Sequence, residues 1–109
     1  MEIPEYDLHK GGMKVDDAIA KLDRVLGLGR GRLFAFVTGY GSSGGTSKIK
    51  EAVLAKLAHY RKIGHVRGFI DGEKAGDMFS AEFLSFPNAA EIPLVYKRTA
   101  NPGVVIVRT

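Results

Sequence analysis

The sequence VTGYGSSGGTSKIK, residues 37–50, joins a buried strand pattern to a helix through a glycine-rich loop. The apolar run Leu33 to Val37 precedes the loop, and a helical pattern opens at Thr46 or Ser47. Glycine permits positive φ angles and close approach of the backbone to a ligand. The first turn of a helix leaves N–H groups unpaired and carries partial positive charge. This order of elements predicts a site for an anion such as a phosphate.

The first turn of this helix carries lysines where acidic residues are normally favoured. Lys48 and Lys50 come first, and Glu51 is the only acid before Lys62, an arrangement that a bound anion would stabilise. The residues expected to contact the anion are Gly39, Tyr40, Gly41, Ser42, Ser43, Gly44 and Gly45, with Lys10, Lys48 and Lys50.

The charge of the chain is concentrated around this loop. The 109 residues carry a net charge of +4 and no cysteine, which fits one domain, 1–109, in a reducing cytoplasm. Residues 1–29 sum to −2, residues 30–70 to +7 and residues 71–109 to −1. This pattern favours a polyanionic partner, although a solvated lysine-rich helix face would look the same. No apolar stretch is long enough to span a membrane.

Strand and helix patterns alternate through the first two thirds of the chain. Tyr6 to His9 alternates as a strand, Val15 to Leu26 has the spacing of an amphipathic helix, and Leu33 to Val37 reads as a central strand covered on both faces. A second helix follows the loop and ends at Gly64, and Val66 to Ile70 is a third strand. We therefore expect an α/β fold, a two-layer βαβαβ sandwich with a mostly parallel sheet of about four strands.

The remaining third is harder to interpret. Asp77 can cap a short helix, and residues 94–98 and 104–108 read as strands joined by a turn at Asn101-Pro102-Gly103. Residues 73–101 are expected to be an insertion before the final strand.

Three side chains near the loop suggest phosphodiester chemistry. Asp7 and His9 are expected at the carboxyl end of the first strand and Thr38 at that of the second, and ligands of open α/β sheets bind at this edge. His9 can transfer a proton to or from a reacting oxygen. Asp7 can orient the imidazole or hold a cation such as Mg²⁺. Tyr40 can stack on a base or pack as a loop anchor.

Less specific interpretations of these residues, and two other motifs, are alternatives to phosphodiester chemistry. An Asp and a His two residues apart are more often a local hydrogen-bonding pair than a catalytic dyad, and His59 and His65 are expected at the surface. Residues 39–44 fit GxGxxG, with Asp71 as the acid after the next strand, but the chain lacks the second half of a dinucleotide-binding fold. Residues 39–46 nearly fit the P-loop pattern, but Gly45 stands in place of its lysine.

Four stretches in this order resemble the Smr (small MutS-related) domain: DLHKGG, VDDAIAKLDRVL, TGYGSSGG and the final GVVIV. The likeness covers residues 5 to about 70 and resumes at about 103. It implies an α/β sandwich, nucleic-acid binding and, in many members, endonuclease activity on DNA or RNA, with some members acting at ribosomes. Asp7 and His9 match the first motif, and Thr38, Gly39 and Gly41 match the second.

The chain departs from the Smr pattern at three places. Lys10 replaces a glycine, Thr38 stands where many members have a second histidine, and residues 73–101 are extra. We expect a nucleic-acid-binding domain that cleaves phosphodiester bonds. The alternatives are a non-catalytic module that docks on RNA or ribosomes, and a nucleotide-binding regulatory domain. The module would use Lys48, Lys50, Lys56, Arg61 and Lys62.

Overall fold

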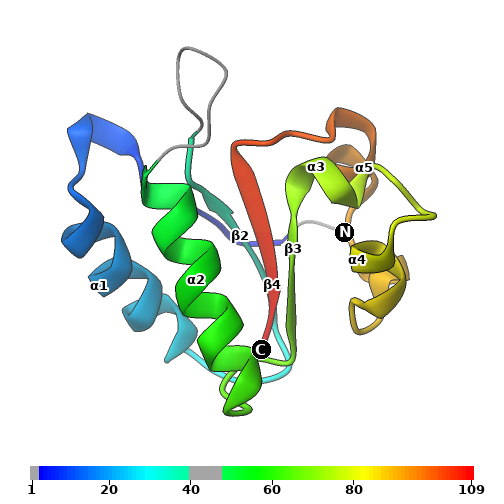
Figure 1. Ribbon diagram of the computed structural model, residues 1–109, viewed down its shortest axis with the longest axis horizontal. Helices are drawn as coiled ribbons and strands as arrows, with labels where there is room; N and C mark the ends of the chain where they lie inside the picture. Colours follow the sequence, from blue (N-terminus) through cyan, green and yellow to red (C-terminus); the bar gives the residue numbers. More distant parts are fainter. Residues whose placement is uncertain (1–2, 40–47) are drawn as a thin grey trace.

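A four-stranded sheet lies between two helical layers in the computed structural model, which describes residues 3–39 and 48–109 (Figure 1). The strands are β1 (Glu5–Asp7), β2 (Leu33–Val37), β3 (Gly68–Asp71) and β4 (Val104–Arg108), in the spatial order β1-β2-β4-β3. The pair β1 and β2 is parallel, whereas β4 is antiparallel to both β2 and β3. The described residues thus form the expected number of strands in a mixed sheet, and the expectation of a mostly parallel sheet is wrong.

The position of β4 explains this difference. The first three strands run in the same direction, as the alternation of strands and helices predicted. However, β2 and β3 are not neighbours, because the last strand enters between them from the opposite end. Spacing along a sequence identifies successive strands, but it does not show whether a later strand will separate them.

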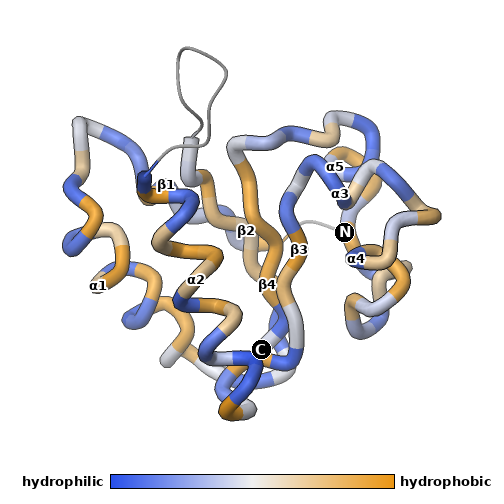
Figure 2. Tube along the Cα trace, in the orientation of Figure 1, coloured by the Kyte–Doolittle hydropathy of each residue, from blue (hydrophilic) through white to orange (hydrophobic). Residues whose placement is uncertain are grey.

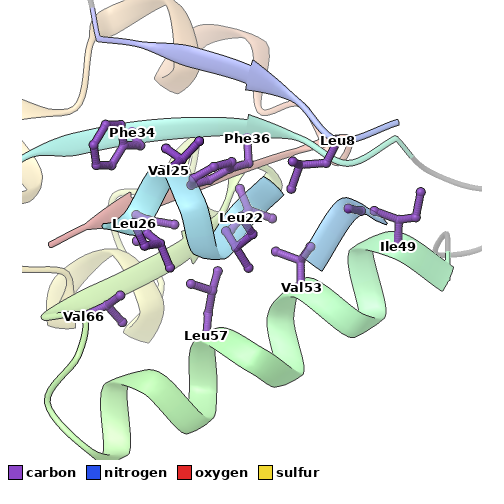
Figure 3. Packing of buried hydrophobic residues seen from close by; sticks show 13 residues of the cluster. Leu8, Leu22, Val25, Leu26, Phe34, Phe36, Ile49, Val53, Leu57 and Val66 are labelled. Carbon is purple, nitrogen blue, oxygen red and sulfur yellow. The ribbon is translucent and has the colours of Figure 1, made fainter. Parts of the chain in front are cut away.

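The helices α1 (Val15–Leu26) and α2 (Lys48–Lys62) cover one face of the sheet. Phe34 and Phe36 of β2 point toward them, and the closely packed interior includes Leu22 of α1 and Val53 of α2 (Figure 3). The buried residues of α1 have the predicted helical spacing: Ala18, Leu22, Val25 and Leu26. The first helix and its apolar stripe are therefore confirmed.

A polar contact on the outer side joins the two helices. The hydroxyl of Tyr60 in α2 donates to Asp23 Oδ1 in α1 at 2.5 Å. Partial burial, the hydrogen bond and the negative charge of Asp23 together raise the pKa of Tyr60 to about 12. His59 and His65 are exposed beside the Tyr60 ring, which confirms their expected surface position.

The other face is covered by residues 72–100, which add a third layer to the expected two (Figure 1). This segment contains α3 (Gly72–Ala75), α4 (Ala81–Ser85), the 3-10 turn η2 (Ala89–Glu91) and α5 (Leu94–Thr99); a second 3-10 turn, η1 (Lys10–Gly12), precedes α1. A separate apolar cluster lies beneath the layer, with Ala35 and Ile106 from the sheet and Phe83, Phe86 and Ile92 from the segment. Figure 2 shows that hydrophobic residues follow the strands between the layers.

Two local expectations in this segment are wrong. Residues 94–98 form helix α5 and no strand, since Leu94 and Val95 are exposed and only Tyr96 packs on the apolar cluster. A short apolar run does not distinguish a strand from a helix by its periodicity. The cap of α4 is Ser80, whose hydroxyl accepts from the Phe83 amide, whereas Asp77 accepts from the Phe79 amide in the preceding turn.

The strand directions bring several chain ends to one edge of the sheet. This edge, here named the carboxyl edge, contains the ends of β1, β2 and β3 and the starts of α2 and β4, at the top of Figure 1. The opposite edge, the amino edge, contains the starts of β2 and β3 and the end of β4. The common edge predicted for Asp7, His9 and Thr38 therefore exists.

Gly72 fixes the close approach of β3 to the start of β4. A β-carbon on Gly72 would lie 2.7 Å from the Val104 carbonyl oxygen and closer still to that of Asn101. We expect Gly72→Ala to lower the free energy of unfolding by about 2 kcal/mol or more, because backbone must move to admit the methyl group. Chemical denaturation of the purified variant measures this change.

Gly27→Ala is the matched control. Gly27 has a φ of −78°, and its added β-carbon would lie 3.4 Å from the Arg24 carbonyl oxygen, an ordinary contact. We expect this variant to be unchanged or more stable by up to about 1 kcal/mol. Equal stability of the two variants would contradict the close packing at Gly72.

Candidate functional site

The imidazole of His9 lies against the backbone of Gly39 at the carboxyl edge. Asp7 pairs with Val37, and the Leu8 amide donates to the Val37 carbonyl at 2.8 Å, so His9 comes level with Gly39. Leu8 is fully buried and anchors the end of β1, while His9 is exposed.

Gly39 suits this contact for two reasons. Its φ is +70°, a conformation that other residues rarely adopt. A β-carbon at this position would lie 2.8 Å from Cδ2 and 3.0 Å from Nε2 of His9. The structure thus brings together the imidazole and the first glycine of the predicted loop, as the sequence indicated.

The carboxylate of Asp7 shapes the turn that carries His9. Its Oδ1 accepts from the backbone amides of His9 at 2.7 Å and Lys10 at 2.8 Å. β1 ends at Asp7, so the strand alternation that was expected to place the two side chains on one face does not continue to His9. Asp7 therefore positions the backbone of His9. This arrangement agrees with the alternative interpretation, in which Asp7 and His9 are a local hydrogen-bonding pair and not a catalytic dyad.

Thr38 is buried beneath the site. Its hydroxyl donates to the Gly103 carbonyl at 3.3 Å, and the same carbonyl accepts from the amides of Thr38 at 2.7 Å and Gly39 at 3.1 Å. The Gly39 amide therefore points to Gly103, the residue before β4, and is not directed at a ligand, contrary to the expectation. Thr38 fits a residue that fixes the start of the loop better than one that contacts a substrate.

The rest of the loop lies outside the described residues. This applies to Tyr40, Gly41, Ser42, Ser43, Gly44 and Gly45, and to the helix start expected at Thr46 or Ser47. Their roles in anion binding and base stacking stay predictions.

The three lysines predicted for this site have two different environments. Lys10 and Lys48 are exposed near the carboxyl edge. Lys50 is buried, with its Nζ 2.7 Å from Asp71 Oδ2, so this cation has a carboxylate partner, and its role in phosphate binding stays a prediction. The other oxygen of Asp71 accepts from the Glu73 amide at 3.0 Å and caps α3. Both oxygens of Asp71 therefore have partners within the chain. This argues against the dinucleotide site, in which Asp71 would be the acid that follows the next strand.

The positive charge of residues 30–70 is divided between the two edges. Arg30 and Arg32 precede β2 and Arg67 precedes β3, so these exposed residues belong to the amino edge. Lys62 ends α2 about 21 Å from Lys48 along the helix. The set proposed for a docking module, Lys48, Lys50, Lys56, Arg61 and Lys62, therefore does not converge on one patch.

The described ranges hold no cluster of three or more His, Cys, Asp or Glu side chains that could bind a metal ion. One Asp7 oxygen accepts from two amides, and the binding of Mg²⁺ at this edge stays a prediction. Within the same ranges, no helix has the length and apolar character needed to cross a membrane.

Sequence reasoning did not identify two residues that shape the site. The Gly103 carbonyl fixes the end of β2, and Asn101 Oδ1 in turn accepts from the Gly103 amide at 2.8 Å. The Asn101-Pro102-Gly103 turn was recognised, but nothing local indicated that it would lie beside Thr38. That contact depends on the insertion of β4 between β2 and β3.

Comparisons with known proteins add no relative. No protein-family model matches the chain, and no curated protein sequence or solved structure matches it.

The pair of Lys50 and Asp71 is testable by a double-mutant cycle. We expect Lys50→Met to destabilise the domain by about 2 kcal/mol or more, because it leaves a partly buried carboxylate without its cation. Asp71→Asn retains an oxygen for the α3 cap, so Lys50→Met with Asp71→Asn should recover at least half of the loss. Urea denaturation measures the four proteins, and strictly additive effects would contradict a stabilising pair.

Proposed function

We propose that this protein is a nucleic-acid-binding domain of the Smr type that cleaves phosphodiester bonds at the carboxyl edge. One observation carries the proposal: the exposed imidazole of His9 lies against Gly39, where the glycine loop leaves β2. A proton-transfer group therefore stands at the entrance of a loop whose composition suits phosphate. The resemblance of the DLHKGG and TGYGSSGG stretches to Smr motifs gives the same pairing.

In the proposed reaction, His9 acts as the general base or general acid. The neutral imidazole takes the proton of an attacking hydroxyl or water, a new O–P bond forms, and the bond to the leaving oxygen breaks. A protonated imidazole would instead supply the proton that the leaving oxygen needs. Such positioned proton transfer contributes roughly 10² to 10⁴ in rate. The loop would stabilise the additional negative charge through its amides.

The other residues support His9 or hold the substrate. Asp7 and Thr38 are positioning residues in this proposal, since their polar atoms bond to backbone around His9 and Gly39. Lys10, which follows His9 in η1, and Lys48, which begins α2, are exposed and would contact phosphates.

The second candidate is a binding module without catalysis. It is favoured by the burial of Thr38 and by the amide bonds of Asp7, because both residues then hold the backbone and His9 is left without a second catalytic side chain among the described residues. The two functions share the same surface, so cleavage assays and binding assays are needed together.

The first prediction from the proposed function concerns cleavage. We expect the purified protein to cut labelled single-stranded RNA, duplex DNA or supercoiled plasmid, and His9→Ala to lower the rate by about 100-fold or more. His59→Ala is the matched control, because His59 is an exposed histidine near the far end of α2, and its rate should stay unchanged. Parallel reactions with Mg²⁺ and with a chelator establish whether a cation is needed.

Two results would contradict the cleavage proposal. Cleavage that persists in His9→Ala with an unchanged rate would assign the activity to other residues or to a contaminant. Binding of these nucleic acids without any cleavage would select the non-catalytic module. Thermal unfolding of each variant, with a midpoint equal to that of the wild type, ensures that the comparison reports on the site.

The second prediction from the proposed function concerns binding. We expect affinity for duplex DNA to fall with salt, and Lys48→Ala to reduce the logarithmic salt slope by about 0.9 through loss of one phosphate contact. Lys62→Ala, at the opposite end of the same helix, should leave the slope unchanged if the carboxyl edge is the binding surface. Equal effects of the two substitutions would move binding away from the loop, and an affinity insensitive to salt would exclude a polyanionic partner.

A further inference from the structure

A pocket of about 270 Å³ opens at the amino edge, away from His9. Its apolar walls come from Ile3, Pro4 and Leu33, and its charged residues are Arg32, Glu91 and Arg108. β2 separates the two places: Leu33 starts the strand at the pocket, and Val37 ends it beside the His9 site, about 13 Å away. A ligand in this pocket would not overlap the carboxyl edge.

Arg108 is a buried cation with an unsatisfied donor. It pairs with Leu33 across the β2–β4 ladder and shares a face of the sheet with Ile106, two residues earlier. The residue is only 7% exposed, and its Nη2 donates to Glu91 Oε1 at 3.1 Å. Its buried Nε makes no hydrogen bond within the part of the chain that the structure describes. An unpaired buried donor is costly, so a turn of the guanidinium that brings Nε to an acceptor in this pocket would be favourable.

The charges around the pocket favour an anion. The pocket is lined by two guanidinium groups, Arg32 and Arg108, and one carboxylate, Glu91, which pairs with Arg108, so these three side chains carry a formal charge of +1. Arg32 is exposed at the pocket and can contact a bound anion without being buried first. Guanidinium groups match planar carboxylates particularly well, because their N–H donors form a fork.

We propose that this pocket binds a small organic acid with one carboxylate and a short apolar body. The carboxylate is attracted by Arg32 and Arg108, and the Arg108 side chain turns so that its buried Nε donates to the carboxylate. The apolar body lies against Ile3, Pro4 and Leu33, and the pocket volume limits it to a small molecule. The site is separate from the proposed nuclease surface and does not depend on it.

The test follows the Nε–H resonance of Arg108 by ¹H–¹⁵N NMR during titration of the full chain with butyrate and hexanoate. Arg108→Lys assigns the resonance by removing it. We expect a saturable shift with butyrate, and binding at least about tenfold weaker for butyramide, which has the same shape without the charge. A shift that does not saturate, or equal binding of butyramide, would overturn the proposal, as would equal binding of inorganic phosphate, which lacks the apolar body.

Two exposed residues provide variants that do not depend on the buried arginine. Arg32→Gln should weaken butyrate binding several-fold, because it removes one attractive charge. Glu91→Gln should strengthen it, because it removes a carboxylate that competes for Arg108. If Glu91 itself fills the pocket by turning its second oxygen to Nε, wild-type protein will show no butyrate shift, and the proposal fails. Unchanged affinity in both variants would also overturn it.

Discussion

The pairing of β4 with both β2 and β3 is the constraint on which the rest of the structure depends. All five residues of β4 are buried, and its two ladders join strands that the helix α2 had already connected. Its antiparallel direction places Gly103 beside Thr38 and Gly39. The same direction places Arg108 beside Leu33 at the opposite edge. Both proposed sites are therefore consequences of one strand insertion.

At the carboxyl edge, backbone groups and side chains together fix the backbone by hydrogen bonds. One carbonyl, that of Gly103, satisfies two amides and a hydroxyl at the end of β2. One carboxylate oxygen of Asp7 accepts from the amides of His9 and Lys10. These bonds fix the backbone on both sides of the His9 and Gly39 contact. A rigid surrounding of this kind suits chemistry that requires an accurately placed proton donor or acceptor.

Local patterns predicted the parts of the fold that depend on local periodicity. The spacing of Ala18, Leu22 and Val25 identified α1, and the unbroken run of β2 indicated a strand covered on both faces. Strand order and the layer formed by residues 72–100 depend on contacts between distant segments, so no local signal revealed them. Leu94 and Val95 were misread because an apolar run in sequence need not be buried.

The same distinction applies to the candidate site. The neighbourhood of His9 and Gly39 followed from two strands that end at one edge, and the structure has that arrangement. The sequence did not indicate the burial of Lys50, because its partner Asp71 belongs to β3 and lies next to the start of α2 only in the folded protein. Lysine in a first helical turn is usually solvated, and only the tertiary structure shows its carboxylate partner.

The late place of β4 in the chain also affects how the protein can acquire its structure. During synthesis, β2 emerges about 70 residues before β4, the strand with which it pairs at the centre of the sheet, since Leu33 pairs with Arg108. Until residues 104–108 are available, β2 can pair only with β1 and β3 has no strand partner, so their unpaired N–H and C=O groups are open to other chains. The nascent protein therefore passes through a stage in which protection by chaperones, or rapid completion of translation, would reduce the risk of aggregation.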